Sequence, residues 1–109
     1  MFQLSLRMTA RPHHAAEAVK ALRRTTIDAR AERGYLGSRI YQEAANPEAL
    51  CLEEDWANEQ ELKSHICSSS FTDLLMLMET ASEMPVLEVR VVSAVRGLEY
   101  IEAVRFGDN

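Results

Sequence analysis

The chain has 109 residues, of which 47% are hydrophobic, and it contains four glycines and three prolines. This composition is typical of a single globular domain, which we expect to span residues 1–109, and it argues against a disordered chain. The 17 acidic and 12 basic side chains give a formal net charge of −5, and the basic residues are scattered along the chain. Binding to nucleic acid is therefore not expected.

No segment approaches the roughly 20 apolar residues that cross a bilayer, so no membrane association is expected. The first residues lack the basic and then apolar pattern of a signal peptide, which favours a cytoplasmic protein. Cys51 and Cys67 are isolated and are expected to be free, packed thiols. A domain this small buries a modest fraction of its surface, so an apolar sheet face could be covered by a second copy.

The N-terminal part of the chain predicts a strand followed by a helix. From Phe2 to Met8, hydrophobic and polar residues alternate, which is the period of a strand with one buried face. Over residues 13–33 the hydrophobic residues instead follow a helical period. Gly34 is placed to close this helix in the left-handed conformation.

The middle of the chain predicts a β-hairpin and a second helix. Strand patterns over residues 35–43 and 49–56 flank the turn signal Asn46-Pro47, which favours a hairpin. Asn58 is a suitable cap for the helix that follows, with Glu61 in the capping-box position.

The C-terminal part predicts a broken helix and two further strands. The serines at positions 68–70 are expected to bend or interrupt the helix, because their hydroxyl groups compete for backbone hydrogen bonds. Pro85 ends the helical region. Residues 86–96 form a β-branched run, and residues 98–106 are expected to form a last strand after Gly97.

The resulting order is strand, helix, strand, strand, helix, strand, strand. This order predicts an α+β protein with the ferredoxin-like βαββαβ plan and an extra C-terminal strand. The antiparallel sheet should carry its helices on one face, which leaves the other face to be covered.

One segment resembles a known family. The pattern W-x-N-x-x-x-L-x-x-H-x-x-S-x-x-F is similar to the strand-to-helix segment of the antibiotic biosynthesis monooxygenase (ABM) superfamily, and the likeness in element order covers nearly the whole chain. The residues that carry the pattern are Trp56, Asn58, Leu62, His65, Ser68 and Phe71. The resemblance implies a dimeric α/β barrel, in which two copies pair through their sheet faces, with one pocket per subunit between the sheet and the helices.

The resemblance also implies candidate functions. Some members of the superfamily oxygenate phenols or quinols without metal or flavin, so the chain is expected to need no cofactor and to bind a small aromatic ligand. An alternative is a ligand-binding or structural dimer without catalysis. Haem breakdown is less favoured, because the haem-degrading branch uses an Asn on the first strand and this chain has Gln3, Ser5 and Arg7 there.

His65 is the candidate catalytic base, because imidazole titrates near neutral pH. The alternative is a histidine that only hydrogen-bonds a neighbouring strand. Trp56 and Phe71 are candidate substrate-binding residues, although a lone Trp in a small domain is often core. Asn58 could donate to a substrate oxygen, but helix capping also explains it.

Two residues of the second strand, Tyr41 and Arg39, could hold an oxyanion, and they are expected to share one strand face with Tyr35 and Gly37. The alternative for this face is a solvated or intersheet polar surface. No metal site is expected. His13 and Glu17 have i,i+4 spacing but lack further ligands, so a solvated helix start is the better interpretation.

Overall fold

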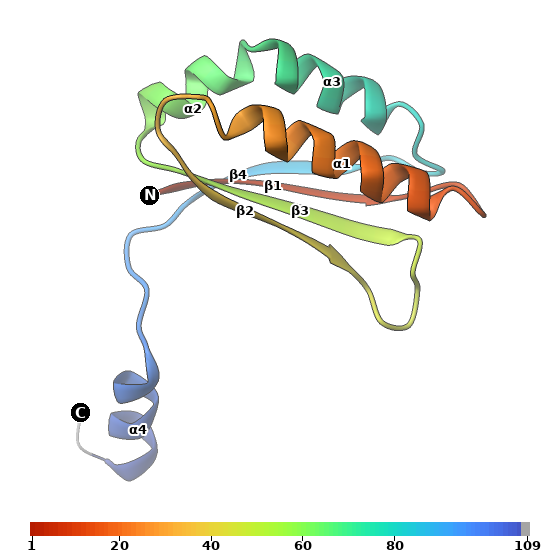
Figure 1. Cartoon of the computed structure of the whole chain (residues 1–109). Coiled ribbons are helices and arrows are strands. Elements are labelled where there is room, and N and C mark those ends of the chain that lie inside the picture. Colours follow the sequence, from red (N-terminus) through yellow and green to blue (C-terminus); the bar gives the residue numbers. More distant parts are fainter. Residues whose placement is uncertain (108–109) are drawn as a thin grey trace.

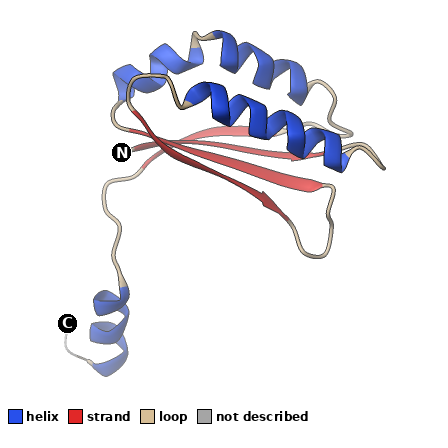
Figure 2. Ribbon diagram, viewed as in Figure 1, coloured by secondary structure: helices blue, strands red, loops and turns tan. Residues whose placement is uncertain are grey.

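The computed structural model of the chain describes residues 1–107. Its elements, in chain order, are β1 (Phe2–Thr9), α1 (Ala15–Ala29), β2 (Tyr35–Gln42), β3 (Ala49–Trp56), α2 (Glu59–Ile66), α3 (Ser69–Met78), β4 (Val86–Val91) and α4 (Leu98–Phe106). The four strands form one antiparallel sheet in the order β2-β3-β1-β4. Helices α1, α2 and α3 cover one face of the sheet, and the other face is bare (Figure 1, Figure 2). The predicted α+β class and ferredoxin-like plan are confirmed.

The core lies between the sheet and these three helices. Alternation along β1 and β3 directs one set of side chains toward the helices, where the apolar faces of α1, α2 and α3 pack against them. The buried hydrophobic residues of this core include Leu4, Leu6, Leu22, Leu50, Leu52, Trp56, Leu62, Phe71 and Leu74. Among the described residues, no helix is both long enough and apolar enough to cross a bilayer.

Helix α1 is shorter than predicted at both ends. His13 has a φ of 68°, which lies outside the helical region, so the helix begins only after His14. At the other end α1 stops at Ala29, and the next residues form a turn. Gly34 adopts the predicted left-handed conformation, with a φ of 84°, but in the turn that enters β2 and not at the helix end.

The predicted hairpin and the predicted break between the second and third helices are both confirmed. Strands β2 and β3 pair antiparallel around the Asn46-Pro47 turn. The side chain of Asn58 accepts a hydrogen bond from the Glu61 backbone N–H at 2.9 Å and caps α2. Ser68 caps α3 in the same way, accepting from the Phe71 N–H at 3.3 Å. A new cap therefore starts α3 where the serine run interrupts α2.

One prediction for the second strand is wrong. Tyr35 does not share a face with Gly37, because a bulge between them shifts the pairing by one residue. Tyr35 lies opposite Trp56 and points into the core, whereas Gly37, Arg39 and Tyr41 lie on the bare face.

The predicted last strand over residues 98–106 is also wrong, because these residues form α4. Strand β4 ends at Val91, before the end of the predicted run. Gly97 precedes α4, and Gly107 closes it with a φ of 74°. The segment contains good helix formers such as Glu102 and Ala103, and it lies away from the sheet, where no neighbouring strand can complete a ladder (Figure 1).

Candidate functional site

The structure divides the predicted site residues into two groups on opposite faces of the sheet. Trp56, His65 and Phe71 lie together in the core, on the side covered by the helices. Arg39 and Tyr41 lie on the bare face. The side-chain oxygen of Asn58 is engaged as the cap of α2, so this residue belongs to neither group.

The core group is a stack of rings around His65. The imidazole lies parallel to the Trp56 indole, with ring centroids 4.3 Å apart and an interplanar angle of 24°. Phe71 meets the imidazole edge to face at 5.7 Å, and Tyr35 meets the indole in the same way at 5.8 Å. The His65 side chain is only 2% exposed, so it is enclosed by these rings.

Two carboxylates flank the His65 ring. Nδ1 lies 3.0 and 3.1 Å from the two oxygens of Glu32. Nε2 lies 3.0 Å from Glu54 Oε1, close enough for an ion pair, but the N–H direction misses the oxygen and no hydrogen bond forms. Glu54 also accepts a longer hydrogen bond, 3.4 Å, from the Trp56 indole N–H. The two carboxylates thus approach the ring from opposite sides.

These contacts set the charge of the imidazole. Burial lowers the pKa of His65, but the carboxylates of Glu54 and Glu32 outweigh this effect, and the net pKa is raised above its ordinary value of 6.5. The folded chain therefore favours the protonated ring. A protonated imidazole cannot accept a proton, so this environment opposes the role of general base.

Glu32 and Glu54 were not among the predicted site residues. Glu54 could have been found, because it occupies an inward position of β3, in phase with Leu50, Leu52 and Trp56. A carboxylate at a core position needs a partner, which is a signal for a buried polar cluster. Glu32 gave no such signal, because it lies in the turn after α1.

The cluster is not arranged as a metal site. Its two carboxylates lie against opposite nitrogens of one ring and so do not converge on a common point. More generally, residues 1–107 contain no group of three His, Cys, Asp or Glu side chains that could hold a metal ion.

On the bare face, Arg39 is engaged by its neighbours. Its guanidinium donates two hydrogen bonds to Asp55, at 2.9 and 3.1 Å, and one to Glu53 at 3.3 Å. The hydrogen bonds from Arg39 and Gln3 hold the pKa of Asp55 below its usual range, although burial opposes them. Arg39 is thus committed to a salt bridge across the hairpin, which fits the polar-surface alternative for this residue.

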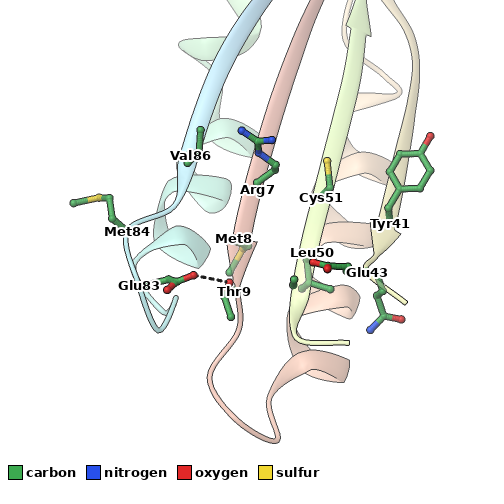
Figure 3. A pocket seen from close by; sticks show the side chains of 12 residues that line it. Arg7, Met8, Thr9, Tyr41, Glu43, Leu50, Cys51, Glu83, Met84 and Val86 are labelled. Carbon is green, nitrogen blue, oxygen red and sulfur yellow. Dashed lines mark hydrogen bonds between the residues drawn. The ribbon is translucent and has the colours of Figure 1, made fainter. Parts of the chain in front are cut away.

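Tyr41 lines a hollow on the bare face that we call the sheet hollow, with a volume of about 290 Å³. Four of its lining residues form a row across the sheet, one on each strand (Figure 3). In the order β4, β1, β3 and β2 they are Val86, Arg7, Cys51 and Tyr41. Its remaining lining residues are Met8, Thr9, Gln42, Glu43, Ala49, Leu50, Glu83 and Met84. The sheet hollow therefore joins apolar surface to a phenol, a guanidinium, a thiol and two carboxylates.

Some polar groups of the sheet hollow already form hydrogen bonds or ion pairs within the chain. Glu83 accepts a hydrogen bond from the Thr9 hydroxyl at 3.1 Å (Figure 3). Arg7 lies 3.5 Å from Glu88, with its side chain largely exposed. Burial, and next the nearby Glu53 carboxylate, raise the pKa of the Cys51 thiol, which keeps it neutral near pH 7. Arg7 and Tyr41 are thus the groups best placed to donate hydrogen bonds to a ligand.

Two further hollows of about 330 and 390 Å³ lie between α1 and α3 and share Ala21, Leu77 and Thr80. Neither is lined by any of the predicted site residues.

Comparison with known proteins identifies related chains. Residues 1–75 match the family model described as antibiotic biosynthesis monooxygenase. A conserved protein from Methanosarcina mazei Go1 is 23% identical, with a TM-score of 0.73, over 82% of this chain and 89% of that one. A candidate antibiotic biosynthesis monooxygenase from Deinococcus radiodurans is 16% identical, with a TM-score of 0.80, over 90% and 98% of the two chains.

The cofactor-independent oxygenase SnoaB from Streptomyces nogalater is 10% identical, with a TM-score of 0.75, over 86% of this chain and 94% of that one. At these identities the structural matches show a shared fold. No curated protein sequence matches the chain.

Proposed function

Because the chain belongs to the antibiotic biosynthesis monooxygenase family, we propose that it is a monooxygenase that oxidises a small phenol or quinol without a metal or an organic cofactor. Family membership supports the class of reaction. The choice of substrate rests on the chemistry of the candidate site, since one fold can serve many functions.

The sheet hollow is the observation that carries the proposal. Its volume, about 290 Å³, is at the lower end of the range of ligand pockets and suits a ligand of one or two rings. The exposed side chains of Met84 and Val86 provide apolar contact for a flat ring. Tyr41 and Arg7 provide donors for a phenolate oxygen, as a developing anion requires.

In the proposed reaction, an activated CH₂ group of the aromatic substrate becomes a carbonyl. The substrate loses a proton, and the resulting anion passes an electron to dioxygen. One oxygen atom enters the substrate and the other leaves as water with the two hydrogens, so the substrate supplies all the electrons. Tyr41 and Arg7 would stabilise the anion, and Glu43, which lines the hollow, would accept the proton.

The alternative assignment places the substrate in the core group, with His65 as the base and Trp56 and Phe71 as ring contacts. It requires the stack around His65 to open and the imidazole to lose its proton within the cluster. The two assignments involve different residues and can be separated by mutation.

We also propose that the chain forms a homodimer through the bare faces of two sheets. The bare face is uncovered in the single chain (Figure 1). The sheet hollow lies on this face. A second copy would exclude water from the hollow, which strengthens the interactions of charged groups inside it.

The test is dissolved-oxygen uptake by metal-free protein with a panel of one- and two-ring phenols and quinols that carry an activated CH₂ group. We expect uptake above the uncatalysed rate, reduced by roughly 10²-fold in Tyr41→Phe or Arg7→Gln, the usual cost of removing one oxyanion donor. Arg33→Gln is the matched control, because Arg33 is 90% exposed and lies outside the sheet hollow.

Each other outcome has a defined meaning. Full uptake in Tyr41→Phe and Arg7→Gln, with loss in a folded His65→Ala variant, would move the site to the core group. No uptake by the wild-type chain on any substrate would favour the non-catalytic ligand-binding or structural dimer. The tight packing around His65 supports this non-catalytic alternative.

A further inference from the structure

Helix α4 presents a stripe of apolar side chains that no other element of residues 1–107 buries. Tyr100, Ile101 and Val104 form one apolar stripe along it and are 50%, 59% and 50% exposed. Glu99 and Glu102 lie on the opposite side of the helix. None of the residues of α4 is buried.

A nine-residue helix of this kind needs a surface to pack against. Isolated helices shorter than roughly 12–15 residues are marginal in water, because helix nucleation is costly. The connecting arm, residues 92–97, is tied to the sheet only at its start, where the Val92 N–H donates to the Met1 carbonyl at 2.9 Å. Beyond Val92, no hydrogen bond joins the described part of the arm or α4 to the rest of the chain.

The direction of the arm indicates where this surface lies. From the end of β4, the arm carries α4 to the side of the bare face, away from α1, α2 and α3 (Figure 1). Six extended residues span roughly 20 Å, and packed sheets lie roughly 10 Å apart. A second copy stacked on the bare face would therefore lie within reach of α4.

The chemistry of α4 favours a protein partner over a membrane. Interfacial helices that bind membranes are usually rich in Lys and Arg on their polar side. Helix α4 instead carries Glu99 and Glu102 against the single Arg105. The bare face offers exposed apolar side chains at the rim of the sheet hollow, including Met84 and Val86.

We propose that α4 is an exchanged dimerisation arm: in the homodimer, the stripe of Tyr100, Ile101 and Val104 packs beside the stacked sheets, over the end of the second copy that carries Met84 and Val86, and closes that copy's sheet hollow. This inference rests on the proposed dimer, and it makes the site incomplete without the partner's helix.

The first test is sedimentation equilibrium of the full chain. Ile101→Glu should weaken dimerisation by roughly 10- to 100-fold, because it places a charge where an isoleucine would be buried. Glutamate forms helices at least as well as isoleucine, so the helix itself is not the cause. Glu102→Gln, on the opposite side of α4, is the matched control and should dimerise like the wild type.

The second test locates α4 directly. In a Cys67→Ser background, Ala103→Cys is treated with a short bismaleimide that can link it to Cys51 in the sheet hollow. A covalent dimer joined between residues 103 and 51 supports the proposal. A link within one chain, or no link, overturns it.

Other results are equally decisive. A wild-type monomer, equal dimerisation by Ile101→Glu, or a monomer that binds anionic vesicles through Ile101 overturns the exchanged arm. Loss of dimerisation in Ile101→Glu with no oxygen uptake by the wild type upholds the arm while the proposed function fails. The two proposals are thus tested separately.

Discussion

At the scale of single residues, His65 combines deep burial with charged neighbours. It is a buried imidazole between two carboxylates and against an indole ring. Breaking a buried ion pair leaves an uncompensated charge, which costs far more than the loss of an exposed pair. His65 therefore helps to hold the helix layer on the sheet, whatever else it does.

This arrangement predicts a pH dependence of stability. The pKa of His65 is raised in the folded chain, so below its ordinary value of 6.5 the ring is protonated in both states and the stabilisation is complete. As the pH rises from 6.5 through the raised pKa, the stabilisation is lost. The free energy of unfolding should fall over this window by about 1.4 kcal/mol for each unit by which the pKa is raised. The urea midpoint of unfolding should fall with it.

A His65→Gln variant should be less stable at pH 6.5 and should lack this decline. His14→Gln provides the control, since the His14 side chain is 59% exposed and forms its ion pair with the exposed Glu17. A wild-type midpoint that stays constant or rises over the window would contradict the charged state of His65.

At the scale of elements, the turn between α1 and β2 shows how one residue positions a helix. Gly34 is left-handed, and a Cβ there would collide with the side chain of Glu61 at the start of α2. Gly37, in β2, has an ordinary backbone and open space around it. The two glycines are therefore a natural pair for comparison.

We predict that Gly34→Ala lowers the free energy of unfolding by about 1–2 kcal/mol from backbone strain alone, and further through the contact with Glu61. Gly37→Ala should leave it within about 0.5 kcal/mol. Urea unfolding of both variants measures the difference, and equal effects would show that the turn tolerates a side chain.

Local signals predicted most elements, and the exceptions have physical reasons. Strands β1 and β3 alternate cleanly, and the caps Asn58 and Ser68 mark real helix starts. The segment 98–106 mixes apolar and polar residues without strict alternation, and its conformation is not fixed by the core of its own chain. The bulge after Tyr35 could not be read from the pattern, and it changed which residues of β2 share a face.

The same limits apply to the candidate site. The contact between Glu32 and His65 joins residues 33 positions apart, so no local pattern contains it. Tyr41 and Arg39 were predicted to belong to the same site as His65 and Trp56. In the structure the two pairs lie on opposite faces of the sheet. Residue types could be predicted, but their convergence depends on tertiary packing.

At the scale of the whole molecule, two uncovered surfaces dominate: the bare face of the sheet and α4 (Figure 2). If both are covered by a second copy, unfolding is coupled to dissociation. The urea midpoint should then rise with protein concentration, adding about 1.4 kcal/mol to the free energy of unfolding of the dimer for each tenfold increase.

Unfolding curves at concentrations a hundredfold apart, followed by circular dichroism, measure this effect. Coincident curves would show that the single chain is the stable unit. Ile101→Glu should bring the curves closer together.

The bulge in β2 has a further consequence, for aggregation. As an edge strand, β2 presents unpaired backbone groups onto which a foreign strand could add, the first step of fibril growth. Leu36 sits at the irregular point and breaks the regular spacing of these groups. Only the stretch after Gly37 remains a regular template, so the residue that disturbs the sheet also limits its growth into fibrils.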